Sequence, residues 1–255
     1  MASLNLVDKM LQKTCMVIWS FSRNTPVLNI TYPAWLDVSK KLGLHCYIAT
    51  DDIDCKLGNA VYFTRSGWKN EWLQVCAKLR DLGYANIISV LDDFYLYKGS
   101  IDKSVLYSIL ENDYDYVSFI PHHNTKCLVK YSSVELDKGF CKINKSWRYR
   151  NSLQVSFWKL SVFESIIKDS NTIWEFEEIP TNFDKFYCVR DGNIHYRHIL
   201  EKGMLNYNAI IYSWKYFFRL KKYYKYNFVQ LFRMPRILVS NLIMKVFGFR
   251  KSEEK

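Results

Sequence analysis

Short apolar runs alternate with amphipathic stretches through the first half of the chain. Runs of strand length occupy residues 15–20, 45–50, 86–91 and 115–120. Between them, apolar positions recur at helical spacing in 68–82, and shorter helical patterns cover 34–42 and 101–110. Gly43 and Gly83 stand where helices of this register should end. Strands that alternate with helices in this way predict an α/β fold with a mostly parallel sheet flanked by helices.

The second half is less regular. Residues 153–158 predict a strand, and 161–168 predict a short helix that Ser161 caps, with Glu164 at the third helical position. Residues 172–178 form a segment of alternating acidic and aromatic side chains. If that segment is extended, its Glu175 and Glu177 share one face, because side chains two apart in a strand point the same way.

The last forty residues differ in kind. Residues 212–232 mix aromatic and basic side chains, and on a helix Phe217, Leu220 and Tyr224 would share an apolar face that most of the basic residues avoid. The apolar run 237–247 is far shorter than the roughly 20 residues needed to span a bilayer. These features predict a helical tail, 213–255, that lies on an anionic membrane surface, beside a larger domain in 1–212.

Charge follows the same division. The net charge is +11, but 11 of the 36 Lys and Arg residues and only 2 of the 25 Asp and Glu residues lie in 213–255. The tail therefore carries a net charge of +9 and the rest of the chain only +2. The seven cysteines include no C-x-x-C pair or zinc spacing, which favours free thiols in a reducing compartment. Residues 1–14 lack the apolar core of a signal peptide, so we expect a cytoplasmic protein.

Adjacent carboxylates end two of the predicted strands. Asp92 and Asp93 follow the run 86–91, and Asp51 and Asp52 follow the run 45–50. Ligands of open α/β sheets collect at the carboxyl ends of the strands, where such acids can hold a divalent cation against the phosphates of a substrate. The sequence therefore favours nucleotide or sugar-nucleotide chemistry, with a solvated acidic turn as the simpler alternative at each pair.

Several short motifs, in order along the chain, resemble a known family. VIWSF, YIATDD, LDDFYL, NSLQVSFWK and WEFE resemble bacterial glycosyltransferases of the GT-A type that assemble capsule and lipopolysaccharide, over roughly residues 15–205. The resemblance implies a Rossmann-like fold, a nucleotide-sugar donor and a divalent metal, Mn²⁺ or Mg²⁺. Many such enzymes carry Asp-x-Asp, whereas Asp92 and Asp93 are adjacent, so the requirement for a metal stays open.

The resemblance also suggests roles for individual residues. Asp93 would hold the metal, and Asp92 would contact the metal or the donor sugar. Asp51 and Asp52 would line the nucleoside pocket. Transfer to an acceptor hydroxyl needs a base, and Glu177 is our first candidate, with Glu175 binding the acceptor.

Other candidates contact the substrates. Trp174 could stack on a sugar ring, Ser152 and Gln154 could hydrogen-bond it, and Arg150 and Lys202 could face the diphosphate. His195, three residues before His198, is a further candidate metal ligand, although surface packing explains such a pair as well.

The sequence thus predicts a peripheral protein on the inner face of the cell membrane that transfers a sugar from a nucleotide donor to a lipid-linked glycan. Two alternatives stay open. One is a non-catalytic protein of the same fold that acts as a scaffold in polysaccharide assembly. The other is a basic nucleic-acid-binding protein, which we do not expect because the apolar run 237–247 offers nothing to a polyanion.

Overall fold

The fold is seen in a computed structural model that describes residues 2–122, 136–137, 139–192, 194–201, 203–206, 216 and 219–225. The chain divides into two compact units, Met1–Tyr196 and Arg197–Lys255. The first unit contains the main sheet and all the helices discussed below.

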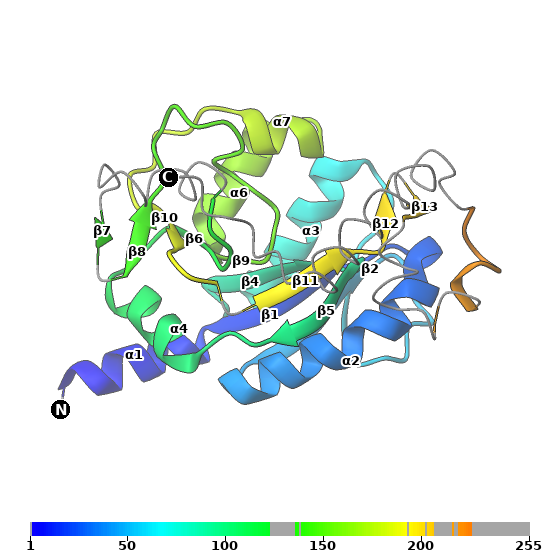
Figure 1. The fold of residues 1–255 in the computed structure, drawn as a ribbon, viewed down its shortest axis with the longest axis horizontal. Coiled ribbons are helices and arrows are strands. Elements are labelled where there is room, and N and C mark those ends of the chain that lie inside the picture. Colours follow the sequence, from blue (N-terminus) through cyan, green and yellow to red (C-terminus); the bar gives the residue numbers. More distant parts are fainter. Residues whose placement is uncertain are drawn as a thin grey trace, which may run out of the picture. The chain divides into compact units, whose positions relative to one another are not determined.

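One mixed sheet organises the first unit (Figure 1). In the described part of the chain it has nine strands, in the spatial order β3 (Asn59–Tyr62), β2 (His45–Thr50), β1 (Thr14–Trp19), β4 (Asn86–Leu91), β9 (Ser156–Lys159), β6 (Tyr116–Ser118), β10 (Phe186–Val189), β8 (Phe140–Lys142) and β7 (Leu136–Asp137). The neighbours among β3, β2, β1 and β4 pair in parallel. Since β9 is antiparallel to both β4 and β6, the strands β6 and β10 run in the same direction as β4. The expectation of a mostly parallel α/β sheet is confirmed.

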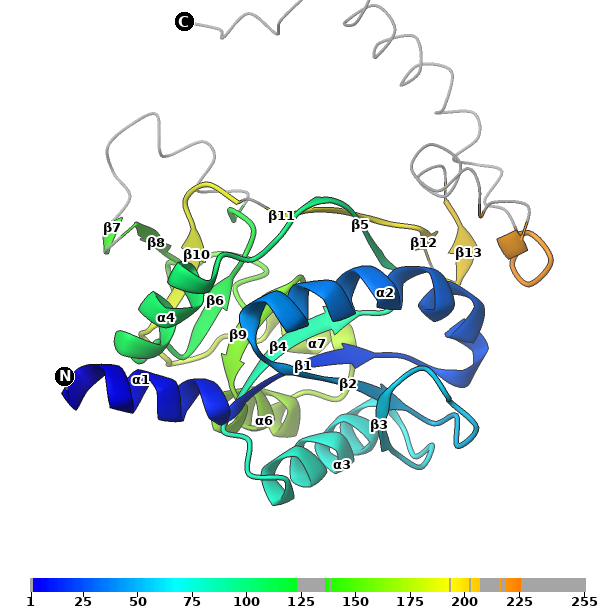
Figure 2. The same cartoon turned by 90° about the horizontal axis from the view of Figure 1, so that it is seen from below.

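Alternation along the central strands builds a core on each face of the sheet. Met16 and Ile18 of β1 join the core under α2 (Thr25–Leu42) and α4 (Lys103–Glu111). The helix α1 (Ala2–Gln12) packs against the same core. Cys15 and Val17 point to the other face and join the core under α3 (Trp68–Asp81) and α6 (Leu160–Asp169). Figure 2 shows α2 on one side of the sheet and α3 and α6 on the other. Burial on both faces explains why these strands read as continuous apolar runs.

Two helices end just before the glycines at which the sequence predicted their ends. Gly43 adopts the left-handed conformation, with φ 74°, directly after α2, and Gly83, with φ 91°, follows α3. The helix before Gly43 is longer than predicted, since it begins at Thr25 and accommodates Pro33 in its interior. Its buried face, which includes Val27, explains why the helix extends past the proline.

Two expectations for the second half are wrong. The helix predicted to begin at a Ser161 cap begins at Leu160, and Glu164 pairs with Arg80 of α3 instead of supporting a capping box. Residues 173–178 form a short helix, α7 (Ile173–Glu178), so the segment is not extended. Thr172 caps it by accepting a hydrogen bond from the backbone N–H of Glu175, a local interaction that competes with the extended form.

Two small strand pairs complete the fold. A ribbon of β5 (Phe94–Gly99) and β11 (Ile194–His198) follows the acid pair at residues 92 and 93, and Phe94 stacks on Tyr196 at 4.4 Å between ring centroids. In the second unit, β12 (Leu200–Glu201) pairs with β13 (Met204–Leu205). Most of the predicted tail, including 226–255, lies outside the described residues. Within the described part, no helix is both long and apolar enough to cross a membrane.

Candidate functional site

Three neighbouring parallel strands end at one edge of the sheet and are each followed by a polar residue. Trp19 of β1 pairs with Ala49 of β2 on one side and with Leu91 of β4 on the other. Ser20, Asp51 and Asp92 come next along these strands, so their side chains gather at the same edge.

Asp92 turns into the protein. Its carboxylate accepts a 2.7 Å hydrogen bond from the Ser20 hydroxyl, and its carbonyl accepts a 2.6 Å bond from the hydroxyl of Thr31 in α2. Only 5% of its surface is exposed. Burial, followed by repulsion from Asp93, raises the pKa of Asp92 to about 7, and hydrogen bonds from Ser20 and Asn24 oppose the rise.

Asp93 occupies a different environment, although it is the next residue. It lies in the turn that joins β4 to β5 and is half-buried. The two carboxylates therefore differ in access to solvent, and only that of Asp93 is accessible enough to meet a ligand at the edge. Asp92 is poorly placed to contact a metal, because its carboxylate is shielded from solvent and hydrogen-bonded to Ser20.

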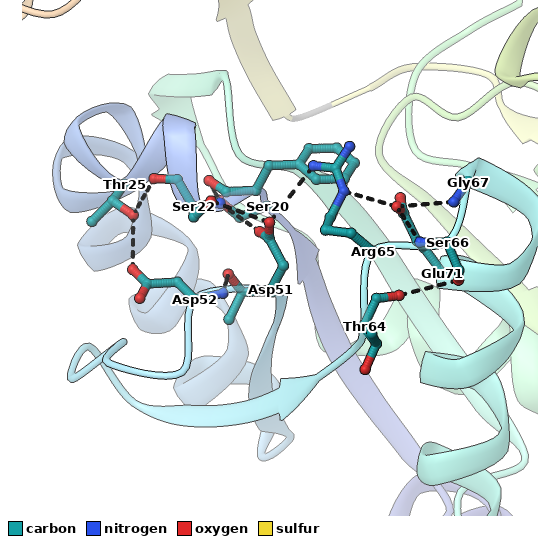
Figure 3. A network of polar contacts seen from close by, with 12 residues as sticks. Ser20, Ser22, Thr25, Asp51, Asp52, Thr64, Arg65, Ser66, Gly67 and Glu71 are labelled. Carbon is teal, nitrogen blue, oxygen red and sulfur yellow. Dashed lines mark hydrogen bonds and ion pairs between the residues drawn. The ribbon is translucent and has the colours of Figure 1, made fainter.

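The predicted pair Asp51 and Asp52 binds the connection between β1 and α2 (Figure 3). Asp51 accepts hydrogen bonds from the backbone N–H of Ser22, at 2.6 Å, and from its hydroxyl, at 3.1 Å. Asp52 accepts a 3.1 Å bond from the Thr25 hydroxyl. These carboxylates hold the loop between β1 and α2 in place beside this edge of the sheet. The sequence pattern did not predict this role.

Arg65 connects the Asp51 carboxylate, which holds this loop, to the start of α3. Its Nε atom lies 2.8 Å from buried Glu71, and its Nη1 atom lies 3.6 Å from Asp51 (Figure 3). The guanidinium also lies over the ring of Phe21, 4.7 Å from the centroid. Glu71 further accepts bonds from the backbone N–H groups of Ser66 and Gly67. Sequence reasoning missed Arg65, although a basic residue just after a strand was a signal that could have found it.

The NSLQ motif lies at the same edge of the sheet, on the side of β4 that faces away from β1. It precedes β9, whose Ser156 lies opposite Ser89 of β4, and the N–H of Phe119, just after β6, donates to Val155. Within the motif, the hydroxyl of Ser152 accepts from the backbone N–H of Gln154 at 3.3 Å. Residues 152–155 thus run between the ends of β4 and β6.

The predicted phosphate contact of Arg150 does not match its surroundings. Its guanidinium is buried, donates to Thr181 and to the carbonyl of Phe183, and lies over the ring of Phe186 at 4.2 Å from the centroid. Burial lowers the pKa of Arg150 to about 10. Arg150 therefore anchors the segment after α7.

Motifs NSLQ and WEFE contact each other directly. The side-chain amide of Asn151 donates to the carbonyls of Phe176, at 3.2 Å, and Ile179, at 2.7 Å. In return, the carboxylate of Glu177 accepts a 3.0 Å hydrogen bond from the backbone N–H of Leu153. Glu177 is thereby held beside the segment that runs to the sheet edge.

The expected shared face of Glu175 and Glu177 is wrong, because residues two apart on a helix lie on nearly opposite sides. Glu175 is exposed and accepts a 2.7 Å bond from the backbone N–H of Asn171, beyond the start of α7. Trp174 of the same helix exposes 65% of its surface, as a side chain for sugar stacking would.

The remaining candidates are scattered. His195 is exposed on β11, with its ring 6.2 Å from that of Tyr97. His198 belongs to the second unit, and Lys202 lies outside the described residues. Across the described part of the chain, no three His, Cys, Asp or Glu side chains form a group that could hold a metal.

No protein-family model and no curated protein sequence matches the chain. Among solved structures, it is similar to a protein from Desulfovibrio desulfuricans G20 that is provisionally assigned as a nucleotide-diphospho-sugar transferase. The two chains share 10% sequence identity, with a TM-score of 0.38, over 69% of this chain and 72% of the other. A similarity of this size does not establish a common function.

Proposed function

We propose that this protein is a glycosyltransferase that uses a nucleotide-sugar donor. The observation that carries the proposal is the arrangement at one edge of the sheet. There, half-buried Asp93 follows β4, the loop after β1 lies on one side, and the segment 152–155 before β9 lies on the other. Carboxyl ends of parallel strands are where open α/β sheets bind nucleotides. Arg65 lies at the same edge, and its guanidinium group can donate hydrogen bonds to a donor substrate.

In the proposed reaction, an acceptor hydroxyl attacks the anomeric carbon of the donor sugar. The new carbon–oxygen bond forms as the bond to the diphosphate breaks, and the nucleoside diphosphate leaves. A carboxylate takes the proton of the attacking hydroxyl, and we assign this role to Glu177 because Leu153 and the α7 backbone hold it beside the sheet edge. Trp174 of the same helix is proposed to contact the acceptor.

Charge at the site sets a further requirement. Asp51, Asp52 and Asp93 place negative charge near the proposed diphosphate, and Arg65 offsets only part of it. A divalent cation held between Asp93 and the donor would supply the missing positive charge. Mn²⁺ or Mg²⁺ is accordingly part of the proposal.

The decisive experiment replaces Asp93 with Asn. We expect the folded variant to lose turnover of a panel of nucleotide sugars, while Asp54→Asn, an exposed acid in the loop after β2, keeps it. Unchanged turnover in Asp93→Asn would refute the site. Donor binding without any turnover by the native protein would instead favour a non-catalytic scaffold.

The finer parts of the proposal concern the acceptor and the membrane. We propose that the acceptor is a glycan on a lipid carrier and that residues 213–255 hold the protein at the inner face of the membrane, a role supported by their net charge of +9 and their aromatic content. Deletion of 213–255 should release the protein from vesicles that contain anionic lipid. Binding that survives the deletion would refute this role, and salt-sensitive RNA binding through the same residues would favour the nucleic-acid alternative.

A further inference from the structure

Tyr149 has an unusual backbone conformation in the turn before the NSLQ motif. Its φ angle is 57°, in the left-handed region that strains a bulky side chain. Among the other non-glycine residues that the structure describes, only Asp113 has a positive φ, at 53°. Aspartate tolerates this region well, and the Asp113 carboxylate lies 2.8 Å from the amine of Lys159. Tyrosine is not a residue type that favours this region, so Tyr149 needs another explanation.

Both neighbours of Tyr149 are fixed. On one side, the Arg148 guanidinium donates to Glu178 of α7 from Nε, at 3.0 Å, and from Nη2, at 2.5 Å. On the other side, buried Arg150 is bound to the segment after α7, and Asn151 is bound to α7 itself. A strained conformation persists only where the surrounding contacts determine it. These contacts therefore fix the direction in which the Cα–Cβ bond of Tyr149 points.

Packing in a core does not account for this residue. The ring of Tyr149 is half-buried and belongs to neither of the two apolar cores. The Arg148 guanidinium lies over the ring, 4.7 Å from the centroid, but Arg148 exposes 68% of its side chain, and such contacts stabilise little at exposed sites. Glycine or asparagine would form the same turn with less strain. Strain that is retained at such a position is typical of a functional site.

The position of the ring relative to α7 indicates the function. Arg148 connects the ring to Glu178, and the residue before Glu178 is Glu177, the proposed base. Four residues after Tyr149, the backbone N–H of Leu153 donates to Glu177. Contacts from both sides of Tyr149 therefore lead to the end of α7 that carries the proposed base.

We infer that Tyr149 binds the acceptor sugar and orients it toward Glu177, an inference that rests on the proposed function. An aromatic ring offers an apolar surface to the C–H groups of a pyranose, and the phenol hydroxyl exchanges hydrogen bonds with a sugar hydroxyl. Because its backbone is fixed on both sides, Tyr149 favours one pose of the acceptor and so selects the hydroxyl that Glu177 deprotonates. Tyr149 thus contributes both to affinity for the acceptor and to the choice of linkage.

The binding test uses the full chain and does not depend on turnover. Protein that carries 3-fluorotyrosine is titrated with the methyl glycosides of glucose, galactose, mannose and N-acetylglucosamine, and the fluorine signals of Tyr149 and Tyr107 are compared by NMR. Tyr107, on α4, is the matched control, because it is also half-buried and has a cation, the Lys103 amine, over its ring at 5.5 Å. We expect at least one glycoside to shift the Tyr149 signal and none to shift the Tyr107 signal.

Variants separate recognition from packing. Tyr149→Asn removes the ring and should weaken glycoside binding, measured from the ligand signals, about two- to tenfold. Its melting temperature should not fall, because asparagine adopts the left-handed conformation with less strain. Tyr149→Phe keeps the ring and should recover part of the affinity. Tyr107→Asn breaks the 3.0 Å bond to Asp8 and should show the reverse pattern, a lower melting temperature with unchanged glycoside binding.

Two results would overturn the inference. One is that no glycoside in the panel shifts the Tyr149 signal. The other is that Tyr149→Asn melts at a lower temperature and binds glycosides as tightly as the native protein, since Tyr149 would then serve packing alone.

Calorimetric titration with UDP, GDP and CDP separates this failure from failure of the proposed function. Binding of a nucleoside diphosphate without any glycoside at Tyr149 removes the acceptor role of Tyr149 and leaves the donor site standing. Glycoside binding at Tyr149 without binding of any nucleoside diphosphate refutes the proposed function instead.

Discussion

The hydroxyl of Ser20 lies 2.7 Å from a carboxylate oxygen of Asp92 and joins the end of β1 to the end of β4. Both residues are almost completely shielded from water. The ionised carboxylate therefore loses solvation, and its pKa rises to about 7, with the charge of Asp93 as the second cause. Near neutral pH, Asp92 is poised between its two protonation states.

This raised pKa predicts a specific pH dependence of stability. An unfolded Asp titrates near pH 3.8, so between about pH 4 and pH 7 the folded state binds more protons than the unfolded state. The free energy of unfolding should therefore fall as pH rises through this window. Asp92→Asn cannot ionise and should escape the loss, which amounts to at most about 4 kcal/mol for a shift of about three pH units.

Urea unfolding of the native protein and of Asp92→Asn at pH 4, 6 and 8 checks this prediction. The variant should be close to the native protein at pH 4 and more stable at pH 8. Asp37→Asn, on the surface of α2, should follow the native protein at every pH. If the native protein and Asp92→Asn differ by the same amount at pH 4 and pH 8, the raised pKa is refuted.

Asn151 should hold α7 in place. Its buried amide donates to the carbonyls of Phe176 and Ile179, and Asn151→Ala leaves both without this partner. We expect a loss of about 1–3 kcal/mol in the free energy of unfolding. Asn70→Ala, on the exposed side of α3, should cost about 0.5 kcal/mol or less. Equal losses in the two variants would contradict an anchoring role for Asn151.

Glu177→Gln tests the proposed base with little disturbance of the fold. The amide oxygen of Gln can still accept the hydrogen bond from Leu153, so the melting temperature should change little. The amide cannot take up a proton, and kcat should fall about 100-fold or more. Glu178→Gln, next along α7 and paired with Arg148 at the surface, should keep nearly full activity. Full activity in Glu177→Gln would place the base elsewhere.

The strands and their shared edge could be predicted from the sequence because they depend on local pattern. Residues 15–20, 45–50 and 86–91 are apolar without interruption, since both faces of the sheet are covered, and each strand in the structure lies within one residue of its predicted bounds. The acids at 51, 52, 92 and 93 then had to gather at one edge, because parallel strands end on the same side.

The partners of the polar side chains could not be predicted in this way. The difference between Asp92 and Asp93 depends on Ser20, which is 72 residues away in the chain. Arg150 is bound by a carbonyl 31 residues later, and no local pattern marks that contact. In WEFE the acidic and aromatic alternation favoured an extended segment, but the Thr172 cap and the burial of Phe176 favour a helix.

Arg65 and Arg80 both pair with a buried glutamate, and the structure predicts opposite consequences of replacing them with Gln. Glu71, the partner of Arg65, also accepts two backbone N–H bonds, so Arg65→Gln should cost little stability. Arg80→Gln leaves buried Glu164 without its charged partner and should cost about 1–3 kcal/mol.

Ligand binding should separate the two variants in the other direction. Arg65 lies at the strand edge beside Asp51, where the nucleotide is proposed to bind, whereas Arg80 lies in the last turn of α3, at the opposite edge of the sheet. We expect Arg65→Gln to weaken binding of nucleoside diphosphates about tenfold or more, and Arg80→Gln to leave it unchanged, in calorimetric titrations. If Arg80→Gln weakens nucleotide binding and Arg65→Gln does not, the diphosphate does not bind beside Arg65, because removal of the Arg65 charge would then leave its binding unchanged.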